Sequence, residues 1–156
     1  MDFKKYLNNG LEAAKIARKN KDEIQGVINE LSDVIKEHSG GLVTLTVSNE
    51  QRLSKSVSSM VIGAAAAAAA AGFGVSPYID YKALSLVLKK GKVNKREQIA
   101  EWRTDESDGY PCVISYNGGE ISCGTKEMLE KALGGLISNA STGERLLKLI
   151  AEGNKE

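Results

Sequence analysis

The chain has 156 residues, of which 42% are hydrophobic and 26% are charged, and its formal net charge is +1. That length suits one domain, residues 1–156, with a hydrophobic core of its own. A net charge so close to zero excludes a strong overall attraction to nucleic acid or to anionic membranes.

Residues 1–38 are predicted to form a long N-terminal helical segment. Residues recur there at alternating spacings of four and three, close to the heptad pattern of a coiled coil: Phe3, Leu7, Gly10, Ala14, Ala17, Lys21, Ile24, Ile28, Leu31 and Ile35. Gly10 and Lys21 weaken this apolar pattern. Asn20 could cap a second start, so the pattern fits one helix or two. It also fits packing on the chain's own domain or a homodimer. His38 is expected at the helix C-terminus, where its charge suits the dipole.

The region 42–124 is predicted to hold a strand, a central helix and a β-meander. Val43, Leu45 and Val47 alternate with threonines, which predicts a strand over residues 42–48. Ser48 with Gln51 three residues later fits a capping box, and an unbroken alanine run over residues 64–71 predicts an Ala-rich central helix. The uncharged stretch Ser56–Ile79 fits a core helix, a membrane segment, or a packing face for another copy or a partner.

The meander is predicted from residue 78 onward. Residues 78–88 have strand propensity, 89–92 form a turn, and 93–103 fit a strand or a helix, with the strand favoured by the hairpins on either side. Asn117-Gly118 predicts a type I′ turn in a hairpin from Tyr110 to Cys123. That turn pairs Cys112 with Cys123. The expected core face of the hairpin comprises Cys112, Ile114, Tyr116, Ile121 and Cys123.

Residues 125–152 are predicted to form two C-terminal helices. Thr125 caps the first, and a capping box from Ser141 to Glu144 begins the second. Helices segregated from a run of strands indicate the α+β class. We therefore expect a long N-terminal helical segment, the Ala-rich central helix, the antiparallel meander, and the two final helices packed on its sheet.

The most specific polar feature is a basic cluster around the turn at residues 89–92. Its members are Lys89, Lys90, Lys92, Lys95 and Arg96, with Trp102 downstream. A cationic hairpin can follow a phosphate backbone while an indole stacks on bases, which makes nucleic-acid binding an alternative function. The competing interpretation is a solvated hairpin whose lysines protect a sheet edge from aggregation.

Catalytic and metal chemistry find little support in the sequence. His38 is the only histidine, and neither a GxSxG nor a phosphate-binding glycine motif occurs. Cys112 and Cys123 do not match a zinc spacing; we expect two buried thiols, with a redox pair as the alternative. We therefore predict no enzyme activity, no metal and no cofactor.

The leading functional hypothesis is a small protein that acts by stoichiometric binding, of the inhibitor, immunity or adaptor type. We expect a protein partner that contacts the basic cluster or an exposed sheet edge. Membrane association through Ser56–Ile79 is the third hypothesis, and a homo-oligomer through the N-terminal or the Ala-rich helix also fits. The N-terminal Met-Asp-Phe-Lys-Lys lacks the apolar core of a signal peptide, so we expect a cytoplasmic protein.

Overall fold

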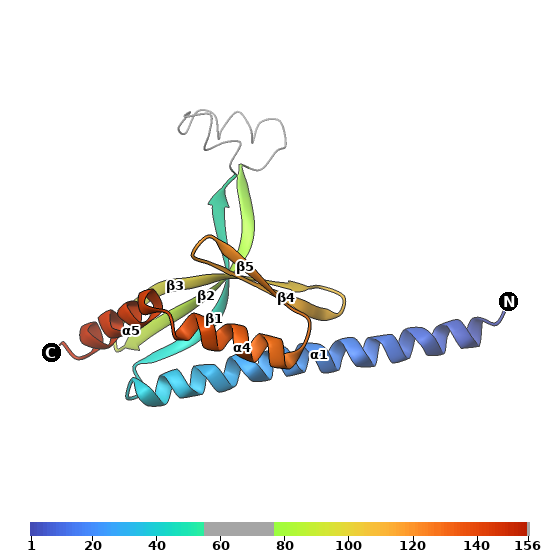
Figure 1. Cartoon of the computed structure of the whole chain (residues 1–156), viewed down its shortest axis with the longest axis horizontal. Coiled ribbons are helices and arrows are strands. Elements are labelled where there is room, and N and C mark those ends of the chain that lie inside the picture. The colour runs from blue at the N-terminus through green and yellow to red at the C-terminus, as the bar shows by residue number, and fades with distance from the viewer. Residues whose placement is uncertain (55–76, 156) are drawn as a thin grey trace.

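The computed structural model describes residues 1–54 and 77–155, and it has the predicted α+β architecture (Figure 1). In chain order the elements are α1 (Phe3–His38), β1 (Val43–Leu53), β2 (Tyr78–Lys90), β3 (Val93–Asp105), β4 (Gly109–Tyr116), β5 (Gly119–Cys123), α4 (Lys126–Ile137) and α5 (Ala140–Gly153). No helix within the described ranges combines the length and apolarity needed to cross a membrane.

The five strands form one antiparallel meander in the order β1-β2-β3-β4-β5. One hydrophobic core joins the sheet to all three helices, as predicted for the C-terminal pair. Its members include Ile28 of α1, Leu86 of β2, Ile114 of β4, Leu133 of α4 and Leu149 of α5. Removing these side chains from water is the dominant favourable term in the free energy of folding.

The N-terminal segment is a single helix rather than two. Asp2 caps it, with its carboxylate accepting a hydrogen bond from the Lys5 amide at 3.2 Å. Asn20 does not start a new helix, because its side-chain amide instead donates to the Asp108 carbonyl at 3.1 Å. His38 is the last residue of α1, as predicted.

The predicted start of the central helix at Ser48 is wrong. Residues 48–53 belong to β1, where Ser48 lies opposite Ala83 and Gln51 opposite Asp80. The alternation that begins at Val43 continues through them, and pairing with β2 outweighs the weak local preference of a capping box. Of the stretch Ser56–Ile79, Tyr78 and Ile79 also lie in a strand, and the predicted alanine helix lies outside the described residues.

The hairpin at residues 110–123 has the predicted register. Asn117 and Gly118 both have positive φ, at 52° and 75°, and Cys112 lies opposite Cys123. Cys112, Ile114 and Cys123 are fully buried, whereas Ile121 is 39% exposed because β5 is an edge strand. The prediction of its core face is therefore correct except at that outer edge.

Two further boundaries are settled by the structure. Residues 93–103 form a strand, the favoured alternative, within β3. Thr125 caps α4 as predicted, but α5 is capped by Asn139 rather than Ser141. The Asn139 side chain accepts from the Ser141 amide at 2.8 Å, which places the helix start two residues earlier than expected.

Candidate functional site

The basic cluster lies at the turn between β2 and β3, and two of its five charges are paired with acidic side chains of the molecule. Lys95 Nζ lies 2.8 Å from Glu152 Oε2, and Arg96 pairs with Glu50 at 2.5 Å. Lys90 Nζ donates to the Gly153 carbonyl. Within the described chain, Lys89 and Lys92 are the members whose side chains have no such partner. Lys95 and Arg96 therefore tie β3 to α5 and β1, while Lys89, Lys90 and Lys92 have no acidic partner among the described residues.

Trp102 does not lie on the surface of that hairpin. It is only 6% exposed and belongs to the core, between Lys82 on β2 and Ile114 on β4. The alternation of β3 directs it toward the layer that the helices cover. A buried indole offers no face on which a base could stack, so the predicted stacking role does not agree with this structure.

The two thiols lie opposite each other and are both free and fully buried. Burial raises the pKa of Cys112 to about 12, and the neighbouring Cys123 thiol adds to the shift. Burial also raises the pKa of Cys123. Because the thiolate is the reactive form, both groups are poor nucleophiles at neutral pH and pack as small apolar side chains.

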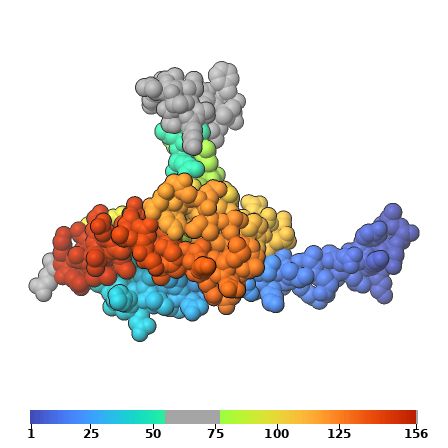
Figure 2. Space-filling view, in the orientation of Figure 1, coloured from blue at the N-terminus to red at the C-terminus, as the bar shows by residue number. Residues whose placement is uncertain are grey.

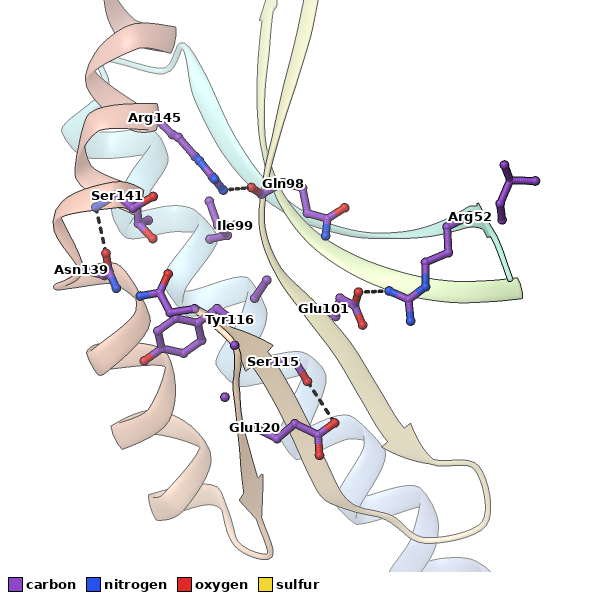
Figure 3. A pocket seen from close by; sticks show the side chains of 16 residues that line it. Arg52, Gln98, Ile99, Glu101, Ser115, Tyr116, Glu120, Asn139, Ser141 and Arg145 are labelled. Carbon is purple, nitrogen blue, oxygen red and sulfur yellow. Dashed lines mark hydrogen bonds and ion pairs between the residues drawn. The ribbon is translucent and has the colours of Figure 1, made fainter. Parts of the chain in front are cut away.

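A groove of about 740 Å³ lies between β3, the β4–β5 turn and the start of α5 (Figure 3). Its polar groups are largely bonded to one another. Arg52 pairs with Glu101, Arg145 donates to the Gln98 carbonyl, and Ser115 donates to Glu120 at 3.4 Å. Residues 1–54 and 77–155 contain no cluster of acidic, histidine or cysteine side chains that could hold a metal ion.

The projecting half of α1, residues 3–19, extends beyond the body of the molecule and exposes apolar side chains (Figures 1 and 2). Large side chains are exposed along it: Phe3 73%, Tyr6 65%, Leu7 63%, Leu11 52% and Ile16 60%. Contact with the body begins at Asn20 and Ile24, beside Asp108 and Gly109. Apolar groups gathered on one exposed element are typical of an interaction surface.

No protein-family model, no curated protein and no solved structure matches this chain. The chemistry of its own surfaces is therefore the evidence for function. Two members of the basic cluster are paired internally, several polar groups of the groove bond to one another, and the thiols are buried. The projecting half of α1 instead exposes apolar side chains that nothing in the described chain covers.

The sequence indicated the N-terminal helix as a possible homodimer surface, but it did not indicate which half of the helix would be exposed. The heptad pattern runs through both halves of α1, so it gave no sign that only the C-terminal half would meet the sheet. Two signals were available. The seam becomes poorer in large residues at Gly10, Ala14 and Ala17, and Tyr6 and Leu11 stand beside it without an obvious partner in the core pattern.

Proposed function

We propose that this protein acts by stoichiometric binding of another protein, as an inhibitor, immunity or adaptor protein does, and that the projecting half of α1 is its contact surface. The observation that supports this is the exposure of Phe3, Tyr6, Leu7 and Leu11 on a helical segment whose residues 3–16 are all exposed. An isolated helix of this length is marginal in water, because most helical stability in proteins comes from packing of the apolar face.

Burial of this surface would contribute to the free energy of binding but would not by itself give tight binding. Full burial of a large apolar side chain contributes about 1.5–3 kcal/mol, so four would contribute roughly 6–12 kcal/mol. Association costs on the order of 4–15 kcal/mol in lost freedom of motion and ordering. Tight binding therefore requires that the partner add contacts of its own around the apolar stripe.

Charge around the stripe defines the chemistry of that partner. The exposed basic residues of the projecting half are Lys4, Lys5, Lys15, Arg18 and Lys19, against the single acidic residue Glu12. Within the described chain only Lys15 among them has an ion pair, with Glu12 at 3.0 Å. A partner with an apolar groove and an acidic rim would complement this surface and would associate faster at low salt.

A reducing, cytosolic setting forms part of the proposal. Cys112 and Cys123 lie opposite each other within strand-pairing distance and are nevertheless unpaired. Disulfides are rare where glutathione and thioredoxin keep thiols reduced. Two buried free thiols are compatible with that environment.

The test is capture of a partner from native lysate with the tagged full chain, after nuclease treatment. The informative variants are Leu7→Glu and Leu11→Glu, and the matched control is Val34→Glu. Val34 is 55% exposed on the same helix but lies beyond the point where α1 joins the body. We expect the unmodified chain and Val34→Glu to retain one protein in a 1:1 ratio, and the two other variants to lose it. Equal capture by all of them, or loss of the protein on nuclease treatment, would contradict the proposal.

A further inference from the structure

β1 is an edge strand of the sheet, and its hydrogen bonds show which of its backbone groups face outward. The Ser54 amide donates to the Pro77 carbonyl at 2.8 Å, and the Lys89 amide donates to the Leu42 carbonyl at 3.3 Å. Even-numbered residues on this strand therefore direct their backbone groups toward β2. Because the backbone alternates along a strand, odd-numbered residues direct theirs away from the sheet.

The first two outward amides are covered by side chains of the α1 region. The Val43 amide donates to Ser39 Oγ at 2.9 Å, and the Leu45 amide donates to Ser32 Oγ at 3.1 Å. The single Ser39 hydroxyl proton lies within reach of two carbonyls, Lys36 at 3.1 Å and Val43 at 3.3 Å. Side chains from outside the sheet thus close the edge where β1 runs beside α1.

The edge is open farther along β1. The outward amides of Val47, Asn49 and Gln51 have no acceptor among residues 1–54 and 77–155. Figure 1 shows this part of the strand rising with β2 beyond the body of the molecule. The pairing with β2 is regular to Leu53, and residues 47–53 contain no proline, lysine or bulge, which are the usual protections of an edge.

We propose that this open edge pairs with β1 of a second copy of the chain, antiparallel and with the two-fold axis at Gln51. Charge selects this register among those that bring outward residues together. An axis at Glu50 places Glu50 opposite itself, which is repulsive. An axis at Asn49 places Glu50 opposite Ser48. An axis at Gln51 places Glu50 opposite Arg52 of the other copy, twice by symmetry.

The surrounding charges support the same arrangement. Glu50 pairs with Arg96, and Arg52 pairs with Glu101, on solvent-accessible side chains. Bringing Glu50 opposite Arg52 of the second copy would join these pairs into a row of alternating sign across the interface. The paired segment is short, residues 49–53, so the dimer is expected to be weak and to depend on protein concentration. This inference does not involve α1 and is independent of the proposed function.

Disulfide trapping of Gln51→Cys in the full chain tests the register directly. Residues that face each other in a hydrogen-bonded antiparallel pair have Cα atoms about 5.5 Å apart, which is within disulfide range. We expect Gln51→Cys to form a covalent dimer under mild oxidation. The matched control is Asn49→Cys, which lies opposite Leu53 of the other copy. Its two cysteines would be roughly 14 Å apart, at about 3.4 Å per residue, and should not link.

Gln51→Pro tests the backbone hydrogen bonds without a charge change. Proline removes an outward amide at this position, which an edge strand tolerates. It also removes the exposed hydrogen bond from the Gln51 side chain to Asp80, a loss that Gln51→Ala reproduces without removing the amide. We expect sedimentation velocity to show a concentration-dependent dimer for the unmodified chain and a dimer at least tenfold weaker for Gln51→Pro, with unchanged circular dichroism and melting temperature. A chain that stays monomeric at every concentration, a dimer that Gln51→Pro does not weaken, or a cross-link at Asn49→Cys in place of Gln51→Cys would overturn the proposal.

Discussion

The two halves of α1 share one sequence pattern but have different surroundings. In the anchored half, residues 20–38, Ile24, Val27, Ile28 and Ile35 are buried against the sheet and α4. In the projecting half, Phe3, Leu7 and Leu11 continue the apolar pattern in solvent. The difference teaches that periodicity identifies the apolar face of a helix but not the element that covers it. The projecting half is where we expect a second molecule to supply that cover.

The boundary between the halves is defined by contacts with the turn between β3 and β4. Asn20 donates to the Asp108 carbonyl, and the Tyr110 hydroxyl donates to Glu23 Oε1 at 2.7 Å. Gly109 lies directly against the Ile24 side chain. N-terminal to these contacts, residues 3–16 of α1 are all exposed, so the stability of the body should not depend on them.

The largest expected effect separates the two halves by their contribution to stability. Ile28→Ala, in the anchored half, removes a side chain that is 4% exposed and should lower the free energy of unfolding by about 2–5 kcal/mol. Leu7→Ala, in the projecting half, should change it by no more than about 0.5 kcal/mol. Urea denaturation of the two variants measures both values. Equal losses would show that the projecting half packs on the body.

A smaller loss is expected at the boundary. Gly109 has φ of +85°, and a Cβ atom there would lie 3.1 Å from Ile24 Cδ1. Gly109→Ala therefore combines an unfavourable backbone conformation with a crowded contact, and should cost roughly 1–3 kcal/mol. Gly10→Ala is the control, because Gly10 has open space around it and lies in the projecting half. That variant should be neutral or slightly stabilising, since alanine favours helix.

High pH should lower the stability of the body of the molecule. The pKa of Cys112 is raised to about 12 by burial, and the pKa values of Cys123 and Tyr110 are also raised, chiefly by burial. These groups ionise more readily in the unfolded chain than in the folded one. The free energy of unfolding should therefore be constant below a pH of about 9 and should decline above it. Melting temperatures from pH 7 to pH 10.5 should fall above pH 9, and Cys112→Ala should make the fall shallower. A melting temperature that rises through this range would contradict the burial of these groups.

The smallest expected effect concerns the basic cluster. Lys89→Glu and Lys92→Glu reverse the two charges that lack partners in the described chain, and they should change affinity for the captured partner by less than twofold. Leu7→Glu should reduce it by at least tenfold. Titration calorimetry with the purified partner compares the variants. A strong loss at Lys89 or Lys92 would transfer the contact surface from α1 to the turn between β2 and β3.

Local patterns predicted those parts of the fold that short-range chemistry determines. The Asn117-Gly118 turn requires positive φ at both positions, and this alone set the register that places Cys112 opposite Cys123. Ser48 shows the limit of such reasoning, because a capping-box pattern and a continuing strand were both compatible with the same residues. The long pairing with β2 decided the outcome, and that pairing partner lies about 30 residues away in the sequence.

The candidate sites were harder to predict, since they depend on which side chains the fold covers. Lys95 and Arg96 were correctly placed near a turn, but their acidic partners Glu152 and Glu50 come from distant parts of the chain. Trp102 was assigned to the surface of the same hairpin, yet the face it occupies is covered by helices. The N-terminal helix was considered as a homodimer surface, but its exposed half could not be delimited because a sequence pattern does not show where packing ends.

Hydrogen exchange of the full chain, alone and with its captured partner, tests the central claim most directly. In the free chain, amides of residues 3–19 should exchange at least a hundredfold faster than those of residues 24–35, because no tertiary contact holds them closed. On binding, protection should rise in residues 3–19 and stay unchanged in residues 24–35. Equal protection of both halves in the free chain, or a complex in which residues 3–19 remain unprotected, would contradict the account.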